Sequence, residues 1–198
     1  MEAATLSARD EILSAAIPIF ARKGYAGTGV QEILDAAHLS KPTLYYYFGN
    51  KAGLFHAILD SAYDDSFALM KLAVKAGTSV EEQLAGAAAA LFEFTETHRD
   101  LTRLVLATIF AAPEEVPPEA INTAKRRQNF DMVLGVFEQA RSRGEVDPLF
   151  DLDDLAHGFL GAVSHRIRTH LLTGEGDLDR QLAEKIVLLF MNGARERK

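Results

Sequence analysis

The sequence predicts an all-α protein of about nine helices, and three features of its 198 residues lead to this prediction. Apolar residues recur three and four positions apart along almost the whole chain, which is the spacing of one helix face. Residues that cap helices, and glycines that end them, stand between these stretches. We find no alternation of Val, Ile or Thr with polar residues of the kind that indicates strands.

The first predicted helix begins after Ser7 and ends at Gly24. Ser7 is an N-cap residue with Asp10 three positions later, and Gly24 accepts the positive φ that often follows a helix. Pro18 lies inside this helix and removes one backbone hydrogen bond, so the sequence predicts a bend there. A break is not expected, because the apolar face continues past the proline: Ile12, Leu13, Ala16, Ile17 and Phe20.

Two short helices come next, at the spacing of a helix-turn-helix. Thr28 and Gln31 form a T-x-x-Q capping box, which predicts the start of the second helix. Ser40 is the N-cap candidate for a third helix over residues 41–48. Because about three residues join the two helices, they predict a helix-turn-helix over about 29–48.

Six further helices are expected in the rest of the chain. Asn50, Ser79 and Asp151 are the candidate N-caps of three of them. The expected ranges are 51–75, 80–97, 100–111, 119–143, 152–172 and 178–194.

The third predicted helix carries three consecutive tyrosines, whose directions follow from the 100° between neighbours on a helix. Leu44 and Phe48 share one face, which predicts that both enter the core. Tyr45 and Tyr47 flank that face on opposite sides. The outer surface then consists of Pro42, Thr43 and Tyr46.

That outer surface has the chemistry of a DNA-reading helix. The major groove admits one helix, a threonine hydroxyl can bond base edges, and tyrosine hydroxyls can reach phosphates at the groove walls. Lys41 and Lys51 add positive charge at helix N-termini, where the dipole already favours anions. Tyr46 has two other interpretations, which are burial within the small domain and a patch that binds protein.

The charge distribution permits a nucleic-acid partner although the net charge is −7. Residues 1–51 carry five basic and five acidic side chains, and the other 147 carry 16 basic and 23 acidic ones. The acidic excess therefore lies away from the predicted helix-turn-helix.

The composition also indicates the cellular compartment in which the protein is expected. The chain has no cysteine, which excludes disulfides and thiolate metal sites. No apolar run reaches the ~18 residues of a membrane span, and MEAATLSARDE at the N-terminus has no signal-peptide pattern. We therefore expect a cytoplasmic protein with no membrane partner.

Residues 8–59 resemble the DNA-binding domain of the TetR family of transcriptional regulators. The most specific stretch is SKPTLYYYFGNKAGL (40–54), in register with FARKGY (20–25). The resemblance implies an all-helical homodimer whose first three helices bind double-stranded DNA. It implies a DNA-binding domain over residues 6–66 and a ligand-binding and dimerisation domain over 67–198.

By position, the DNA contacts of the family fall on nine residues: Thr28, Gln31, Lys41, Pro42, Thr43, Tyr45, Tyr46, Tyr47 and Lys51. Three positions depart from the family pattern. Gly29 stands where the family usually has Thr or Ser, which removes a possible phosphate ligand, and Gln31 stands where Arg is frequent, which weakens that contact. His38 replaces the usual Gly after the second helix, but His adopts positive φ more readily than most residues.

The second domain is expected to hold an effector pocket and a dimer interface. The pocket candidates are aromatic and polar residues: Phe92, His98, Arg103, Phe110, Asn129, Phe130, Phe159 and His165. A four-helix interface is expected from small and apolar residues on the last two helices: Gly158, Gly161, Ala162, Ile186, Leu189 and Phe190. Ordinary core packing of the phenylalanines, and packing of these two helices within one chain, are the alternatives. The histidines show no metal-ligand spacing, so no metal site is expected.

These features predict a ligand-responsive repressor that a small apolar or amphipathic effector releases from a palindromic operator. An enzyme is one alternative, but the sequence lacks a Gly-rich phosphate loop, a G-x-S-x-G motif and an H-E-x-x-H motif. We therefore expect neither catalysis nor a cofactor. A helical adaptor that dimerises without binding DNA is the other alternative.

Overall fold

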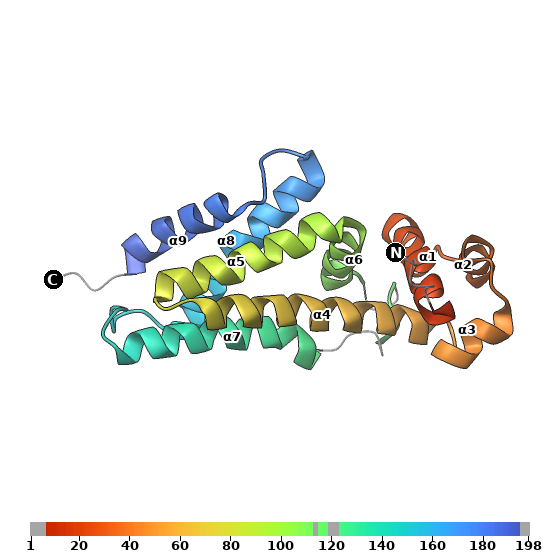
Figure 1. The fold of residues 1–198 in the computed structure, drawn as a ribbon, viewed down its shortest axis with the longest axis horizontal. Coiled ribbons are helices and arrows are strands. Elements are labelled where there is room, and N and C mark those ends of the chain that lie inside the picture. The colour runs from red at the N-terminus through yellow and green to blue at the C-terminus, as the bar shows by residue number, and fades with distance from the viewer. Residues whose placement is uncertain (1–6, 113–114, 119–122, 195–198) are drawn as a thin grey trace, which may run out of the picture. The chain divides into compact units, whose positions relative to one another are not determined.

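Helices make up most of the computed structural model, which describes residues 7–112, 115–118 and 123–194 (Figure 1). The described residues form nine α-helices and no strand, which confirms the predicted fold class. The helices are α1 (Ala8–Lys23), α2 (Val30–Ala37), α3 (Lys41–Phe48), α4 (Lys51–Ala76), α5 (Val80–Thr97), α6 (Arg99–Phe110), α7 (Thr123–Ser142), α8 (Leu152–Thr173) and α9 (Arg180–Ala194). Within the described ranges, no helix is both long enough and apolar enough to cross a bilayer.

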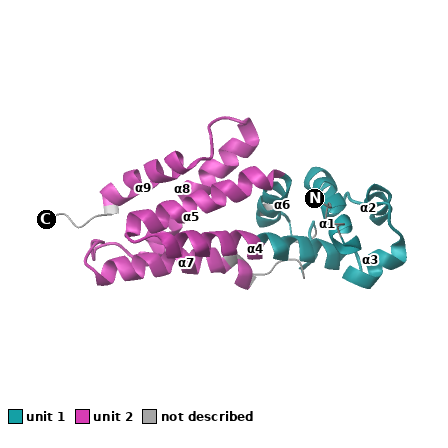
Figure 2. Cartoon of the chain, viewed as in Figure 1, with its two compact units in different colours: residues 1–62, 100–122 teal, residues 63–99, 123–198 magenta. Residues whose placement is uncertain are grey.

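The chain divides into two compact units (Figure 2). Unit 1 comprises residues 1–62 and 100–122, and unit 2 comprises residues 63–99 and 123–198. Unit 1 thus contains α1, α2, α3, the first half of α4 and nearly all of α6. The division expected between residues 66 and 67 stays a prediction, and α4 runs continuously through that point.

Several helices begin at the caps that the sequence predicts. The amide of Asp10 donates to Ser7 Oγ (3.2 Å) before α1, and the amide of Glu82 donates to Ser79 Oγ (3.1 Å) before α5. Asp151 accepts from the first amides of α8. Each cap satisfies backbone donors that have no partner within their own helix, which explains why the boundaries were readable from sequence.

The start of α2 differs from the prediction. The N-cap is Gly29, and α2 begins at Val30. Thr28 turns inward instead: its side chain is 2% exposed, and its hydroxyl donates to the carbonyl of Gly24 (2.7 Å). The capping box of Thr28 with Gln31 is therefore wrong, because the Thr28 hydroxyl already has a partner in the preceding loop.

An aromatic cluster forms the centre of unit 1. The rings of Phe20 and Phe55 meet edge to face with centroids 5.0 Å apart, and Tyr25 packs against Phe55 at 5.1 Å. Phe20 and Phe55 are fully buried. Helix α1 continues unbroken through Pro18, as expected, so its apolar face reaches this cluster.

Helix α5 is buried on almost all sides in unit 2, where it packs against α7, α8 and α9. Its sequence AGAAAA (85–90) supplies small side chains there, which lets neighbouring helices approach closely. At Gly86, an added Cβ would lie 3.0 Å from the backbone carbonyl of Ala73 on α4. A side chain at this position would therefore press on the backbone of α4.

We expect Gly86→Leu to lower the free energy of unfolding by about 1–3 kcal/mol, because α5 would have to move away from α4. Chemical denaturation followed by circular dichroism measures this. Gly135→Ala on α7 is the matched control, since among the described residues no atom lies within 4 Å of its added Cβ. That control should stabilise the protein by up to about 1 kcal/mol through helix propensity. Equal stability of both variants would contradict the prediction.

Candidate nucleic-acid interface

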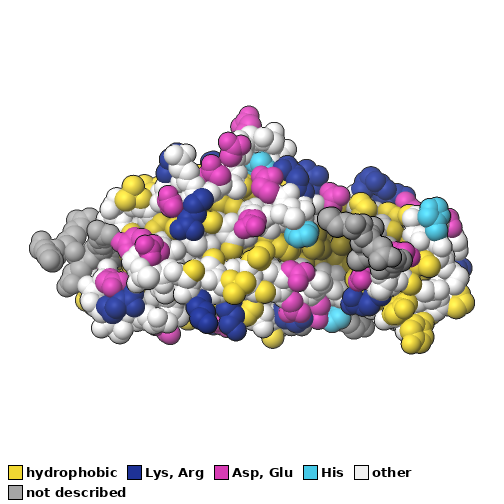
Figure 3. Space-filling model, viewed as in Figure 1, with side chains coloured by type: hydrophobic (Ala, Val, Ile, Leu, Met, Phe, Trp, Pro, Cys, Tyr) yellow, Lys and Arg dark blue, Asp and Glu magenta, His cyan; other side chains and the backbone are white. Residues whose placement is uncertain are grey.

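Helix α3 buries one side and exposes a tyrosine surface on the other. Leu44 is completely buried, whereas Tyr45, Tyr46 and Tyr47 are 50%, 82% and 41% exposed. Hydrophobic side chains accordingly reach the surface of unit 1 over α3 (Figure 3). The exposure of Tyr46 confirms the direction that the helical angle predicts and excludes its burial within this chain. The rings of Tyr46 and Tyr47 meet edge to face at 5.0 Å, which holds them as a pair.

The N-terminal turn of α3 carries the polar part of the same surface. Lys41 and Pro42 are exposed and Thr43 is half-buried. The hydroxyls of Ser40 and Thr43 lie 2.9 Å apart and share a hydrogen bond. Lys41 has no hydrogen bond or ion pair within the described part of the chain. Its ammonium group is therefore free to approach an anion at the N-terminus of α3.

Phe48 does not enter the core as the sequence predicts. It is half-buried, and the guanidinium of Arg9 lies 5.6 Å from its ring centroid. It lies in the last turn of α3, just before Gly49, and its side chain remains partly accessible to solvent. The apolar spacing predicts that Phe48 lies on the same helix face as Leu44, but it does not predict how deeply each side chain on that face is buried.

Helix α2 presents a charged and amide surface next to α3. Gln31 is exposed and donates through Nε2 to Asp35 Oδ1 (2.7 Å). Lys23 donates to both carboxylate oxygens of Glu32, at 2.7 and 2.8 Å. The turn after α2 places His38 at φ 54°, which confirms that histidine can take the place of glycine there. Gln31 is thus accessible to DNA, although it already has one partner.

Lys51 is engaged within the chain, which sequence reasoning missed. Its ammonium donates to the carbonyls of Tyr25 and Thr28, both at 2.9 Å, and lies 4.2 Å from the centroid of the Tyr25 ring. Burial lowers the pKa of Lys51 from its ordinary value. Residue type and position alone do not separate Lys51 from Lys41, which also begins a helix but stays exposed.

The predicted pocket residues do not converge. Phe92 and Phe159 are fully buried core residues, whereas His98, Arg103 and His165 are exposed. Arg103 also belongs to unit 1, and the side chain of Phe110 lies outside the described residues.

Asn129 and Phe130, in the first half of α7, keep the properties of pocket residues. Asn129 Oδ1 is buried and has no hydrogen-bond partner among the described residues. The half-buried ring of Phe130 packs on the His157 ring at 4.4 Å. A buried oxygen without a hydrogen-bond partner is a place where a ligand could supply the missing donor.

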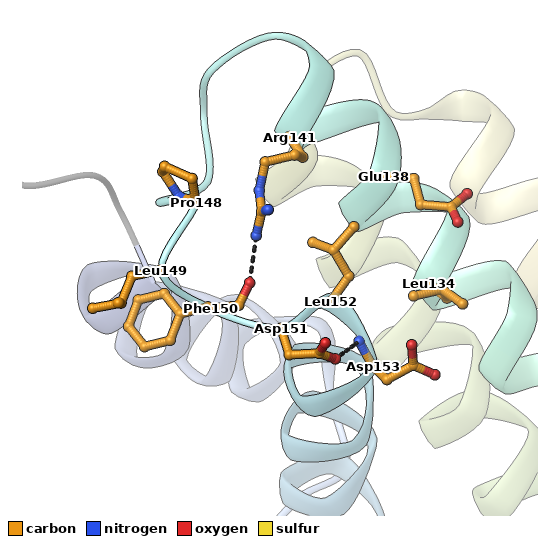
Figure 4. A pocket seen from close by; sticks show the side chains of 9 residues that line it. All are labelled: Leu134, Glu138, Arg141, Pro148, Leu149, Phe150, Asp151, Leu152 and Asp153. Carbon is orange, nitrogen blue, oxygen red and sulfur yellow. Dashed lines mark hydrogen bonds between the residues drawn. The ribbon is translucent and has the colours of Figure 1, made fainter.

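A surface pocket of about 460 Å³ lies at the turn between α7 and α8 (Figure 4). Three carboxylates, of Glu138, Asp151 and Asp153, line it together with Leu149 and Phe150. None of the predicted pocket residues contributes to its walls. Because it opens to solvent and its walls carry these charges, its lining does not match an apolar effector.

Both ring nitrogens of the buried His170 have partners within unit 2. Its Nδ1 donates to the carbonyl of Gly176 (2.6 Å), and its Nε2 lies 2.8 Å from both Arg99 Nη1 and Glu96 Oε1. These contacts tie the loop after α8 to the end of α5. Within the described ranges, no group of three His, Cys, Asp or Glu side chains could hold a metal ion.

The predicted dimer residues divide into two groups. An added Cβ on Gly158 would lie 3.3 Å from the Phe190 ring, and Phe190 packs on Phe159 at 5.9 Å within the same chain. The second group lies at the surface: Gly161, Ala162 and Leu189 are exposed, and Ile186 is half-buried. Leu189 is 80% exposed, so α9 carries an apolar side chain that this chain does not cover.

Sequence comparison connects the helix-turn-helix with a known family. The family model for bacterial regulatory proteins of the tetR family matches residues 12–58. The HTH-type transcriptional repressor ComR of Escherichia coli is 33% identical over 162 residues, which cover 78% of this chain and 75% of ComR. The HTH-type transcriptional activator FasR of Mycolicibacterium smegmatis is 32% identical over 108 residues, which cover 54% of this chain and 49% of FasR. The chain thus spans about half the length of some curated relatives that it matches.

Solved structures show the same fold. The transcriptional regulator FadR from Bacillus subtilis, crystallised in complex with stearoyl-CoA, superposes with a TM-score of 0.82 at 18% identity. The match covers 94% of this chain and 99% of FadR. With the family model on the helix-turn-helix and the similarity to ComR over most of both chains, the chain belongs to the TetR family of bacterial regulatory proteins.

Proposed function

We propose that this protein is a ligand-responsive transcriptional regulator, not an enzyme, that binds double-stranded DNA through the outer surface of α3. The observation that carries the proposal is the 82% exposure of Tyr46 on a helix anchored by a fully buried Leu44. Contiguous exposed apolar side chains mark interaction sites, and Tyr46 forms such a patch with the exposed Tyr45 and Tyr47 on α3. A short, rigidly held helix with an aromatic and hydroxyl-bearing face has the dimensions and chemistry of the major groove.

The proposed contacts divide by chemistry. Pro42, Thr43 and Tyr46 read base edges and the thymine methyl group, while Tyr45 and Tyr47 reach the phosphates on either side. Lys41 neutralises a phosphate, and Gln31 contacts the backbone from α2. Thr28 is left out of this set because its hydroxyl is buried and bonded to Gly24.

A homodimer on a palindromic operator completes the proposal. The exposed surface of α8 and α9 around Gly161, Ala162 and Leu189 is the proposed interface with a second copy. A two-fold dimer would place two α3 helices in successive major grooves, about 34–36 Å apart.

Leu189→Arg tests this interface. An arginine there would bring a charge into an apolar contact, so the variant should elute as a single chain of 21.7 kDa in light-scattering chromatography. Leu149→Arg is the matched control, because Leu149 is 85% exposed in the turn between α7 and α8. A Leu189→Arg variant that stays dimeric would remove α9 from the interface.

The effector is proposed to be a small apolar or amphipathic molecule bound in unit 2. FadR of Bacillus subtilis was crystallised with stearoyl-CoA, which is such a molecule, and Asn129 offers a buried oxygen without a partner among the described residues. Helix α4 belongs to both units and provides the covalent connection between effector and DNA sites. The effector can change DNA affinity only by its preference for one conformation, typically ~1–3 kcal/mol.

Repression in the cytoplasm is the proposed biological outcome, since the alignment with the repressor ComR covers more of both chains than that with the activator FasR. Footprinting of genomic fragments at low salt tests DNA binding, and in vitro transcription from a protected promoter tests repression. A protected palindrome, with affinity falling steeply as salt rises, is expected. A dimer that protects no fragment at low salt would indicate the adaptor instead.

A further inference from the structure

Lys51, the first residue of α4, directs its charge into unit 1. The ammonium nitrogen donates to two backbone carbonyls, of Tyr25 and Thr28, at 2.9 Å each. It also lies 4.2 Å from the centroid of the Tyr25 ring, within the range of a cation–π interaction. An ammonium group has three N–H donors, and these two carbonyls accept from two of them.

The helix dipoles of α4 and α1 both favour this position of the ammonium group. At the N-terminus of its own helix the dipole opposes a positive charge. The carbonyls that bind it follow the C-terminus of α1 at Lys23, where a dipole favours a cation. The Lys51 side chain therefore connects the start of α4 to the loop that follows α1.

The bound carbonyls belong to the loop that leads into α2. The Tyr25 carbonyl also accepts from the amide of Thr28 (3.3 Å), and the Thr28 hydroxyl donates to Gly24 (2.7 Å). Thr28 is followed directly by Gly29, the N-cap of α2. A displacement of the Thr28 carbonyl would therefore act on the residue next to the N-cap of α2, the helix that packs on α3.

We propose that Lys51 is a positioning residue, which holds the loop between α1 and α2 and so sets α2 and α3 for DNA, and that it does not neutralise a phosphate. This inference rests on the proposed DNA-binding function. It departs from the role that the family resemblance implies for this lysine.

Lys41 provides the matched comparison within the same unit. It is also the first residue of a helix, but it is exposed and has no hydrogen bond or ion pair in the described residues. If a substitution removes a lysine that neutralises a phosphate, the negative slope of log affinity against log salt becomes shallower by about 0.9. Replacing either lysine by methionine removes the charge and keeps a flexible apolar stem.

The test compares Lys51→Met and Lys41→Met by hydrogen exchange of the free protein and by operator affinity at several salt concentrations. Lys51→Met should accelerate exchange at residues 25–32 and leave α8 unchanged. It should weaken operator binding about ten- to hundredfold, the scale of losing charge-assisted hydrogen bonds, at an unchanged salt slope. Lys41→Met should leave exchange as in the wild type and lower the slope. If Lys51→Met does not fold, Lys51→Gln replaces it.

The outcomes separate this inference from the function it rests on. Unchanged exchange in Lys51→Met, or a salt slope lowered as in Lys41→Met, overturns the positioning role and assigns Lys51 to a phosphate. Uniformly faster exchange across both units overturns it too, because that indicates general destabilisation. Failure of the wild type to bind any DNA rejects the proposed function, and the exchange of residues 25–32 still decides whether Lys51 holds the loop.

Discussion

Tyr46→Ala is expected to weaken operator binding by about 1–3 kcal/mol for each half-site, which is roughly 5- to 150-fold. The side chain is 82% exposed, and its ring contacts Tyr47 at 5.0 Å. Removing it takes little from the folded chain, so the free energy of unfolding should stay within about 0.5 kcal/mol of the wild type. Fluorescence anisotropy with labelled operator, together with chemical denaturation, measures the two quantities.

Two further variants identify what Tyr46 contributes. Tyr46→Phe keeps the ring and removes the hydroxyl, so it separates an apolar contact with a base from a hydrogen bond. Leu149→Ala removes another large exposed side chain from unit 2 and should leave operator affinity unchanged. Wild-type affinity of Tyr46→Ala would show that α3 does not read DNA with this residue and would favour a protein-binding patch.

Phe159→Ala is expected to lower the free energy of unfolding by about 3–5 kcal/mol, the usual cost of a large cavity in a core. Phe159 is completely buried, and its ring meets Phe137 at 6.5 Å and Phe190 at 5.9 Å, both edge to face. For a chain of this length the melting temperature should fall by about 2–4 °C for each kcal/mol. Differential scanning calorimetry and denaturant titration check this.

The same variant decides between core and pocket for Phe159. A residue that lines an effector cavity already borders empty space, so its truncation would cost well under 2 kcal/mol. Leu172→Ala, on the same helix and 85% exposed, is the matched control and should change stability by less than about 0.5 kcal/mol. A loss no larger than that of the control would return Phe159 to the effector pocket.

The sequence was most informative where a single local interaction decides the structure. Ser7, Ser79 and Asp151 cap their helices as predicted, because each hydroxyl or carboxylate reaches an amide two or three residues away. The tyrosine surface of α3 was predictable for a similar reason, since helical angles depend only on neighbouring residues.

The roles of Thr28 and Lys51 could not be predicted from local sequence patterns. Both have the residue type and the position of a phosphate ligand, and the family resemblance implies that role. In the folded chain the Thr28 hydroxyl donates to Gly24, and the Lys51 ammonium donates to carbonyls 26 and 23 residues earlier in the chain. Which of two acceptors a donor binds depends on distances across unit 1, and these distances are not encoded in any local pattern.

By itself, the sequence determined the helical class, several helix caps, the outward direction of Tyr46 and, through SKPTLYYYFGNKAGL, the TetR family. Helical periodicity and capping depend on residues within one or two helical turns, so they can be predicted from the sequence alone. The tertiary structure alone decided that Phe48 stays half-buried, that Phe92 and Phe159 are fully buried, and that the Lys51 ammonium donates to the carbonyls of Tyr25 and Thr28. These outcomes depend on which distant segments fill the space around each side chain, because burial and hydrogen-bond partners arise only when helices pack together.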